Sequence, residues 1–159
     1  MGSENNTTLN YENGHYVGEV KDGLKDGKGV YYWNNGDRYE GEYSNDKKEG
    51  KGIYFYNYGD RYEGDYKNGK KDGKGIYYYN SGNKYDGDWR NGNMEGKGVF
   101  YYNNGDRYEG DYKNDKKEGK GILYFNNGNR RMGDYCNDKP IGKHVILHVQ
   151  GEVTTEVYK

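Results

Sequence analysis

A fixed interval of 23 residues runs through the chain and constrains its fold more than any other feature. Tyrosine recurs at this interval from Tyr16 to Tyr108, and glycine recurs at it from Gly18 to Gly133. A period of this length is typical of repeat proteins, in which each unit packs mainly against its neighbours. We therefore expect an array of similar units rather than a fold around one thick core.

The composition agrees with such an array. Hydrophobic residues make up 30% of the chain, with 22 Tyr and 28 Gly, whereas soluble domains are about 45–50% apolar. The buried surface must therefore come mostly from tyrosine rings, which are large but keep a polar hydroxyl. A charged fraction of 32% would allow disorder, but the strict period argues against it.

Each unit has the pattern of a β-hairpin. In the second unit, Tyr39, Gly41 and Tyr43 share one face of a strand over residues 38–44, because side chains alternate along a strand. The return strand is expected over residues 51–56. Asn-Gly or Asn-Asp pairs within the units, and Asn-x-Gly triplets between them, mark the turns. Glycine recurs too often for a helix.

The glycines between tyrosines lack a Cβ, so a ring can lie flat on the backbone there. We expect these rings to line a concave face. The prediction is an all-β fold: a single-layer, elongated antiparallel sheet of six stacked 23-residue β-hairpins, open and curved, with a C-terminal capping hairpin. The predicted parts are a flexible lead-in over residues 1–10, a repeat array over residues 11–144 and a capping hairpin or docking edge over residues 145–159. The units lie near residues 14–35, 36–58, 59–81, 82–104, 105–127 and 128–150.

The sixth unit departs from the pattern. Arg131 replaces the leading tyrosine, and His144 replaces the second glycine of the pair. The aliphatic residues that follow have two interpretations. They are a cap that protects the open sheet edge, or they are a docking edge, including Val153 and Val157, through which a terminal strand pairs with another chain or a second copy.

The residues from Tyr39 onward, Tyr-Glu-Gly-Glu-Tyr-x-Asn-x-Lys-Lys-Glu-Gly-Lys-Gly-Ile-Tyr closed by Asn-x-Gly-Asp, closely resemble the MORN (membrane occupation and recognition nexus) repeat. The resemblance covers residues 14–151 and recurs six times. It implies stacked hairpins in one twisted sheet, and a scaffold or adaptor whose partner, a helix or extended peptide, lies along an aromatic groove. It also implies a setting such as a cilium, flagellum, protist cytoskeleton or membrane junction. Some arrays of the family have been proposed to bind phosphoinositides, and others are appendages of enzymes.

The sequence offers no catalytic constellation. The three histidines have no cysteine or carboxylate at metal-ligand spacing. His144 and His148 would share a face, but two ligands alone make a weak metal site. Cys136 has no histidine nearby in the sequence to activate it. We therefore predict a protein that is not an enzyme, with no catalytic residue, no metal and no cofactor.

The predicted function is a non-catalytic scaffold or adaptor that binds a protein partner along the concave aromatic groove. A formal net charge of -1 provides no field that would favour nucleic acid, so no nucleic-acid partner is predicted. The predicted groove residues are the aromatic side chains of the expected inner face. They are Trp33, Tyr39, Tyr43, Tyr54, Tyr62, Tyr66, Tyr77, Tyr85, Trp89, Phe100, Tyr108 and Tyr112.

Two alternatives remain open. The first is a peripheral membrane protein that binds anionic phosphoinositide headgroups through lysines at the hairpin turns, where acidic residues flank the pairs and partly neutralise them. The second is a regulatory subunit of an enzyme complex. The lysines of the first alternative are Lys47, Lys48, Lys70, Lys71, Lys116 and Lys117.

The expected location is the cytoplasm. A single cysteine, Cys136, fits a reducing compartment, and no apolar run has the length of a signal core or membrane span. Heavy use of Asn, Lys and Tyr, without alanine, suggests an AT-rich protist genome. Together with the settings of the MORN family, this favours a cilium and its axoneme, the wider cytoskeleton or the cell cortex.

Overall fold

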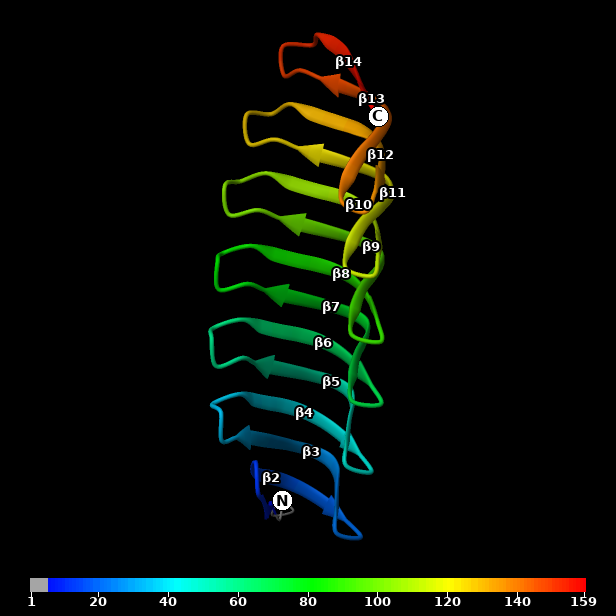
Figure 1. The fold of residues 1–159 in the computed structure, drawn as a ribbon. Coiled ribbons are helices and arrows are strands. Elements are labelled where there is room, and N and C mark those ends of the chain that lie inside the picture. Colours follow the sequence, from blue (N-terminus) through cyan, green and yellow to red (C-terminus); the bar gives the residue numbers. More distant parts are fainter. Residues whose placement is uncertain (1–5) are drawn as a thin grey trace, which may run out of the picture. The chain divides into compact units, whose positions relative to one another are not determined.

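The computed structural model describes residues 6–159, and these contain β-strands and turns but no helix. The chain divides into two compact units, the first ending at Asn80 and the second beginning at Ser81. Within each unit the strands lie antiparallel in chain order and form an open, single-layer sheet (Figure 1). The predicted all-β class and antiparallel arrangement are confirmed.

The strands alternate with short turns along the whole described chain. The first unit contains β1 (Thr7–Tyr11), β2 (Gly14–Lys21), β3 (Leu24–Trp33), β4 (Arg38–Ser44), β5 (Lys47–Phe55), β6 (Arg61–Lys67) and β7 (Lys70–Tyr78). The second contains β8 (Lys84–Arg90), β9 (Asn93–Tyr101), β10 (Arg107–Lys113), β11 (Lys116–Tyr124), β12 (Arg130–Cys136), β13 (Lys139–Leu147) and β14 (Val153–Tyr158).

Each repeat is a hairpin closed by a two-residue turn. In the hairpin of β4 and β5 the central turn residues are Asn45 and Asp46, with φ angles of 47° and 67°. Positive φ at both central residues defines a type I′ turn, whose twist matches that of the flanking strands. On β4, before the turn, the register with β5 shifts between Gly41 and Tyr43, which marks a β-bulge. The turn prediction from Asn, Asp and Gly is therefore confirmed.

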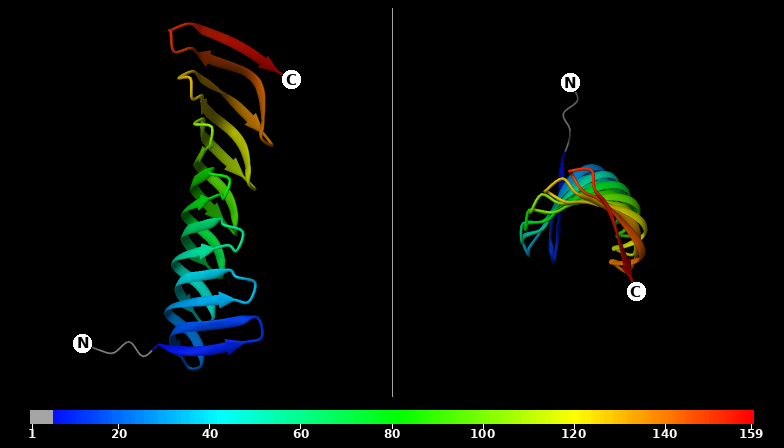
Figure 2. Two further views of the ribbon diagram at one scale, coloured as in Figure 1. Left: turned by 90° about the vertical axis from the view of Figure 1, so that its left-hand side faces the viewer. Right: turned by 90° about the horizontal axis from the view of Figure 1, so that it is seen from above.

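The hairpins are bent into arches, as the end-on view in Figure 2 shows. Tyrosine rings pack on glycine backbone on the inner side of the bend. A Cβ built on Gly52 would lie 2.2 Å from the Tyr39 hydroxyl oxygen, so any larger residue there would displace the ring. Tyr39 is completely buried, and its hydroxyl donates to the Glu42 carbonyl at 3.2 Å. The same ring-on-glycine packing recurs at Tyr16, Tyr62, Tyr85 and Tyr108.

The sixth repeat preserves this packing with different residues. Arg131 stands where the buried tyrosine is expected, and His144 occupies the position of the facing glycine. The His144 ring lies on Gly133, where an added Cβ would be 2.4 Å from it. His144 is completely buried, and its Nε2 lies 2.8 Å from the Asp134 carbonyl. A ring from the opposite strand thus fills the slot that Arg131 leaves empty.

Two predicted boundaries differ from the strand boundaries of the structure. The flexible lead-in over residues 1–10 is wrong for Thr7–Asn10, because these residues pair with β2, from Thr7 opposite Gly18 to Asn10 opposite His15. Residues 1–5 lie outside the described part of the chain. At the other end β14 pairs with β13, so the C-terminal hairpin shares its first strand with the sixth repeat.

The loops between repeats are linked by asparagine side chains. Asn57 Nδ2 donates to the Asn35 carbonyl at 2.7 Å, across one repeat, and Asn80 Nδ2 donates to the Tyr58 carbonyl at 2.9 Å. Asp37 Oδ1 accepts from the Asn57 backbone at 2.8 Å. These contacts explain why Asn and Asp recur at the loops. No helix among residues 6–159 has the length and apolarity needed to cross a bilayer.

Candidate functional site

The inner face of the first unit carries two rows of aromatic rings. The first, here called the buried row, consists of Tyr16, Tyr39, Tyr43, Tyr62 and Tyr66, each at most 6% exposed. Tyr39 meets Tyr43 and Tyr66 edge-on, with centroid distances of 5.2 and 5.0 Å and interplanar angles of 87° and 83°. Such pairs stabilise by about 0.5–1.5 kcal/mol each beyond the area they bury. The buried row therefore acts as the core.

The second row, here called the open row, runs beside it. It begins with Tyr31 and Trp33, whose centroids are 4.5 Å apart, and continues from Trp33 to Tyr54 at 5.2 Å. Trp33, Tyr54 and Tyr56 are half-buried, so their rings remain accessible to a partner. The members of the open row are Tyr31, Trp33, Tyr54, Tyr56, Tyr77 and Tyr79, and two of them, Tyr31 and Tyr77, are buried.

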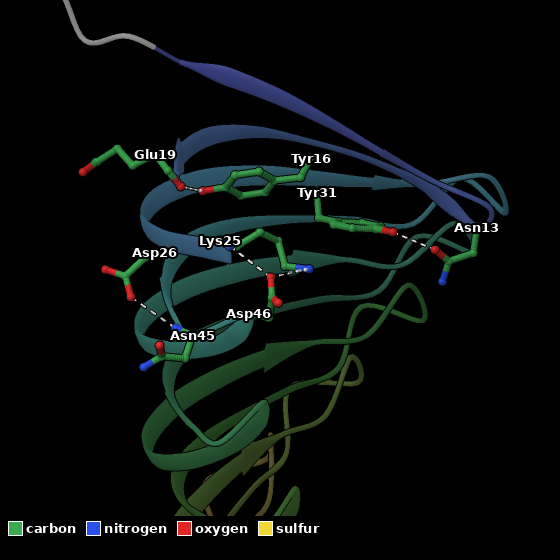
Figure 3. Close-up of polar contacts among 8 residues, drawn as sticks. All are labelled: Asn13, Tyr16, Glu19, Lys25, Asp26, Tyr31, Asn45 and Asp46. Carbon is green, nitrogen blue, oxygen red and sulfur yellow. Dashed lines mark hydrogen bonds and ion pairs between the residues drawn. The ribbon is translucent and has the colours of Figure 1, made fainter. Parts of the chain in front are cut away.

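Hydroxyl contacts fix the orientation of the open row. Tyr31 donates to Asn13 Oδ1 at 2.7 Å, which Figure 3 shows. Tyr54 donates to Asp37 Oδ2 at 2.8 Å. Burial acts to raise the pKa of Asp37, but hydrogen bonds from Asn57, Tyr54 and Asn35 outweigh it, so the pKa lies below its ordinary value. The rings are thus held by charged or amide acceptors at the loops.

Lysines lie over the rings of the inner face. Lys48 Nζ is 4.6 Å from the Tyr54 centroid, 5.3 Å from those of Tyr39 and Tyr66, and 5.6 Å from that of Trp33. An ammonium within about 6 Å of a ring face is attracted by the ring quadrupole. Lys25 and Lys71 occupy the same position in neighbouring repeats and also lie over rings.

Lys48 differs from Lys25 in its charge partner. Lys25 Nζ forms an ion pair with Asp46 Oδ1 at 3.5 Å, as Figure 3 shows. One repeat later the position of Asp46 is occupied by Gly69. Among residues 6–159, Lys48 Nζ forms no ion pair and no hydrogen bond. Burial lowers the pKa of Lys48 to about 8, against a smaller opposing effect of Asp37.

A hollow of about 430 Å³ opens beside these two lysines. Tyr31 and Trp33 of the open row form part of its wall, and Lys25, Lys48 and Gly69 also line it. Its contents can therefore contact both aromatic surface and an ammonium. Asn13, Asp46 and Lys47 complete the polar part of the lining, so the hollow combines an aromatic wall with charged groups.

The inner face of the second unit has the same ring packing but different polar chemistry. Tyr85 meets Tyr112 edge-on at 5.0 Å, and Tyr108 meets Tyr135 in the same way at 5.0 Å. The lysine position is occupied by Met94, which is 8% exposed. In the next repeat Lys117 Nζ donates to the Tyr102 hydroxyl at 2.6 Å.

The predicted groove residues all lie on the inner faces, but most of them are core. Nine of the twelve are buried, and Trp33, Tyr54 and Phe100 are half-buried. Sequence reasoning missed Tyr56, Tyr79 and the lysines over the rings. The missed aromatics carried a signal, since Tyr56 and Tyr79 follow Trp33 at the 23-residue interval.

The lysines of the predicted lipid edge fall into two groups, one exposed and one half-buried. The first lysine of each pair, Lys47, Lys70 or Lys116, is exposed beside the turn, whereas Lys48, Lys71 and Lys117 are half-buried over the rings. The six therefore do not form one stripe.

The predicted docking edge lies on the outer strand β14. Val153 is 60% exposed and Val157 is 76% exposed. Both point to the same side of β14 because they are four residues apart on a strand.

The histidines and the cysteine are placed apart. His148 Nε2 lies 2.9 Å from the Thr154 hydroxyl, and His144 is enclosed between Tyr135 and Tyr158. Cys136 is a free, half-buried thiol. Within residues 6–159 no group of three or more His, Cys, Asp or Glu is placed to hold a metal ion.

The family comparison identifies the repeat. The model of the MORN repeat matches five consecutive segments: residues 16–38, 39–61, 62–84, 85–107 and 108–130. A search of curated proteins found no match.

Domains of SAS-4 and CPAP are among the solved structures that match this chain. The SAS-4 (dCPAP) TCP domain of Drosophila melanogaster, solved in complex with a proline-rich motif of Ana2 (dSTIL), has a TM-score of 0.50 and 13% identity, over 96% of this chain and 90% of that chain. The G-box domain of CPAP has a TM-score of 0.31 and 14% identity, over 97% and 99% of the two chains. The TCP10 domain of Danio rerio CPAP has a TM-score of 0.29 and 14% identity, over 96% and 99%. At these identities the likeness concerns the fold alone.

Proposed function

The chain belongs to the MORN repeat family, and from this premise we propose that it is a non-catalytic scaffold or adaptor that binds a protein partner along its inner face. The observation that carries the proposal is the open row of the first unit. Trp33, Tyr54 and Tyr56 are half-buried and closely packed, and a hydrogen bond to Asp37 fixes the Tyr54 ring. Aromatic anchors of this kind dominate the energetics of protein interfaces.

An extended peptide is the favoured form of the partner. The open row offers ring faces and edges beside a hollow of about 430 Å³, and aromatic-lined grooves accept polyproline II segments in several domain families. The TCP domain of similar fold was solved with a proline-rich motif. This likeness supports an extended, proline-rich ligand over a helix.

The setting that we propose is a cytoskeletal assembly, in a cilium and its axoneme, at a centriole or at the cell cortex. Membership of the MORN family supports this setting. Immunofluorescence of the tagged chain against markers of the axoneme and cortex tests it. A diffuse signal that follows neither marker would contradict it.

Site-specific photo-cross-linking tests the binding face. A photoreactive residue placed at Tyr56, on the open row, should capture a defined partner in cells. The same residue at Glu63, which is exposed on the opposite face of the sheet, should not capture it. Trp33→Ala combined with Tyr56→Ala should abolish capture of the partner by a photoreactive residue placed at a third position on the inner face. Equal capture from both faces would show that the inner face is not the site.

A second candidate function is binding of phosphoinositide headgroups. It is favoured by the exposure of Lys47, Lys70 and Lys116 beside the turns, which would contribute about 1 kcal/mol each near an anionic leaflet. Flotation on phosphoinositide vesicles, compared between the native chain and a triple Lys→Gln variant at these positions, tests it. Loss of flotation in the variant and at moderate salt supports membrane binding.

Two further roles concern assembly. As a regulatory subunit, the chain would bind an enzyme through the same inner face, and the cross-linking experiment would identify that enzyme. Self-association would use β14, where Val153 and Val157 are exposed. Light scattering of the native chain and of Val157→Glu tests this, and a native monomer would exclude it.

A further inference from the structure

The ammonium of Lys48 is a charged group on the inner face that no hydrogen bond or ion pair among residues 6–159 satisfies. Four aromatic rings surround Lys48 Nζ within 5.6 Å. Ring faces attract the charge but accept no N–H hydrogen bond of normal strength. No oxygen among residues 6–159 forms a hydrogen bond or ion pair with Nζ. Three N–H donors are thus available in a half-buried, aromatic surrounding.

Neighbouring repeats show what the missing partner would be. Lys25 occupies the same position one repeat earlier, and Asp46 supplies its carboxylate at 3.5 Å. At the equivalent of Asp46, Lys48 meets Gly69, which has no side chain and lines the hollow. The place that a carboxylate takes beside Lys25 is therefore open beside Lys48.

The spacing of the repeats suggests the form of the ligand backbone. Two strands per repeat place equivalent side chains about 9.6 Å apart along the sheet. A polyproline II helix has three residues per turn and advances about 9.3 Å per turn. An extended ligand of this form would therefore present every third side chain to the same position of successive repeats, from Lys25 to Lys48 to Lys71.

From these observations we propose that the first unit selects an extended, proline-rich peptide that carries an acidic residue, whose carboxylate Lys48 binds in the place left open by Gly69. The prolines pack on Trp33, Tyr54 and Tyr56 of the open row. Lys48 is thereby a specificity-determining residue.

A single carboxylate suits this place better than a phosphoinositide headgroup. Asp37 influences Lys48 electrostatically, and Asp46 pairs with Lys25 and lines the hollow. Their charges would repel a ligand that bears several negative charges at one point. A ligand that brings a single carboxylate to this place is repelled less.

Fluorescence anisotropy with synthetic peptides tests the proposal on the full chain. The probe is a labelled peptide of repeated Pro-Pro-Glu triplets, and its matched control is a peptide of repeated Pro-Pro-Gln triplets. A charge-assisted contact at Lys48 should make the glutamate peptide bind about tenfold tighter or more.

Two variants, each of which copies another repeat of this chain, locate the effect. Lys48→Met copies Met94, the residue at the same position in the fourth repeat. Gly69→Asp copies Asp46, whose φ of 67° shows that aspartate fits this turn, and it should neutralise Lys48 as Asp46 neutralises Lys25. Each variant should abolish the preference for glutamate. Lys47→Met, next to Lys48 but exposed beside the turn, should leave the preference unchanged.

Several outcomes would overturn the proposal. Equal affinity for the glutamate and glutamine peptides would do so, as would a preference that survives Lys48→Met, or no binding of either peptide. Flotation on phosphoinositide vesicles that Lys48→Met alone abolishes would assign the ammonium to a membrane instead. Since this specificity presupposes the protein-binding role proposed above, the two are separated by the cross-linking at Tyr56. If a partner is captured there while the peptides fail, only the specificity is wrong; if capture also fails, the role itself is wrong.

Discussion

The two units use the same ring packing but differ in the lysine row. In the first unit this row is Lys25, Lys48 and Lys71, whereas in the second it is Met94, Lys117 and Pro140. Met94 is buried and apolar, and the ammonium of Lys117 is bound by the Tyr102 hydroxyl. The interval that builds the sheet is therefore compatible with several side chains at this position. The scaffold is shared, whereas the half-buried ammonium without an ion pair, Lys48, on which the proposed acidic ligand depends, lies in the first unit.

The largest expected effect concerns what the units share. Tyr39→Ala in the first unit and Tyr85→Ala in the second remove completely buried rings, and each should lower the free energy of unfolding by about 3–5 kcal/mol. Tyr56→Ala, on the half-buried open row, should cost much less. Urea unfolding followed by circular dichroism measures all three. A large loss at Tyr39 with none at Tyr85 would show that the units are not built alike.

High pH should unfold both units through the same rings. Burial raises the pKa of Tyr16 to about 12, and burial likewise raises the pKa of Tyr39 and Tyr108 above their ordinary value of 10.0. A raised pKa in the folded state gives stability that is complete below pH 10 and is lost as pH rises towards 12, because the unfolded tyrosines release their protons first. Circular dichroism and tyrosinate absorbance should therefore change together above pH 10. Tyrosinate that forms near pH 10 without loss of β-structure would contradict this.

Much of this fold was predictable because its determinants are local and periodic. The turn pairs specify hairpins, and Gly52 between aromatic residues specifies a flat ring. The sixth repeat was harder. The replacements at Arg131 and His144 are both visible in the sequence, but their coupling depends on Gly133 lying opposite His144, which is a property of the register. The ring of His144 then fills the slot from the opposite strand.

The site was less predictable than the fold, for two physical reasons. Alternation identifies the inner face but not which of its rings neighbours cover, so core residues such as Tyr62 and accessible ones such as Trp33 look alike. The sequence pattern predicts Lys48 at the turn, because it predicts a return strand that begins at Lys51. In fact β5 begins at Lys47, directly after the two-residue turn. Lys48 therefore alternates onto the same face as Tyr54.

Replacing a lysine of this row by methionine should change the free energy of unfolding by a smaller amount, with opposite sign in the two units. Lys48→Met removes a half-buried charge without an ion pair and should raise stability at pH 7 by about 1 kcal/mol. Lys117→Met removes the hydrogen bond to Tyr102 and should lower stability by about 1 kcal/mol. Thermal unfolding of the two variants measures the contrast. The same sign in both would mean that Lys48 has a partner in the folded protein.

The gain from Lys48→Met should depend on pH. The pKa of Lys48 is lowered to about 8 from 10.5, so between these values the unfolded state binds more protons and the native protein gains stability as pH rises. The advantage of Lys48→Met should therefore be full below pH 8 and should diminish towards pH 10.5. The tyrosines beside it, Tyr39, Tyr54 and Tyr66, have raised pKa values, and Asp37 has a lowered one, so none of them titrates in that window in the folded state. In the unfolded state the tyrosines titrate alike with either residue at position 48, so they do not alter the comparison. An advantage that is constant from pH 7 to 10 would contradict the lowered pKa.

The smallest effect on stability is expected where the second unit is given the lysine that it lacks. Asp115 Oδ1 already accepts from the Met94 backbone at 2.7 Å, as Asp46 Oδ1 accepts from the Lys25 backbone at 2.9 Å. Met94→Lys should therefore recreate the pair of Lys25 and Asp46, and its effect on the free energy of unfolding should lie within about 0.5 kcal/mol. Since Asp115 would neutralise the new ammonium, the affinity for the Pro-Pro-Glu peptide should not change. Adding Asp115→Gly recreates the arrangement of Lys48 and Gly69 instead, and it should raise the number of peptides bound per chain by one in a titration. If the single and double variants bind the same number of peptides, the carboxylate at the turn does not control access to the lysine. The difference between Asp46 beside Lys25 and Gly69 beside Lys48 would then not explain binding at Lys48.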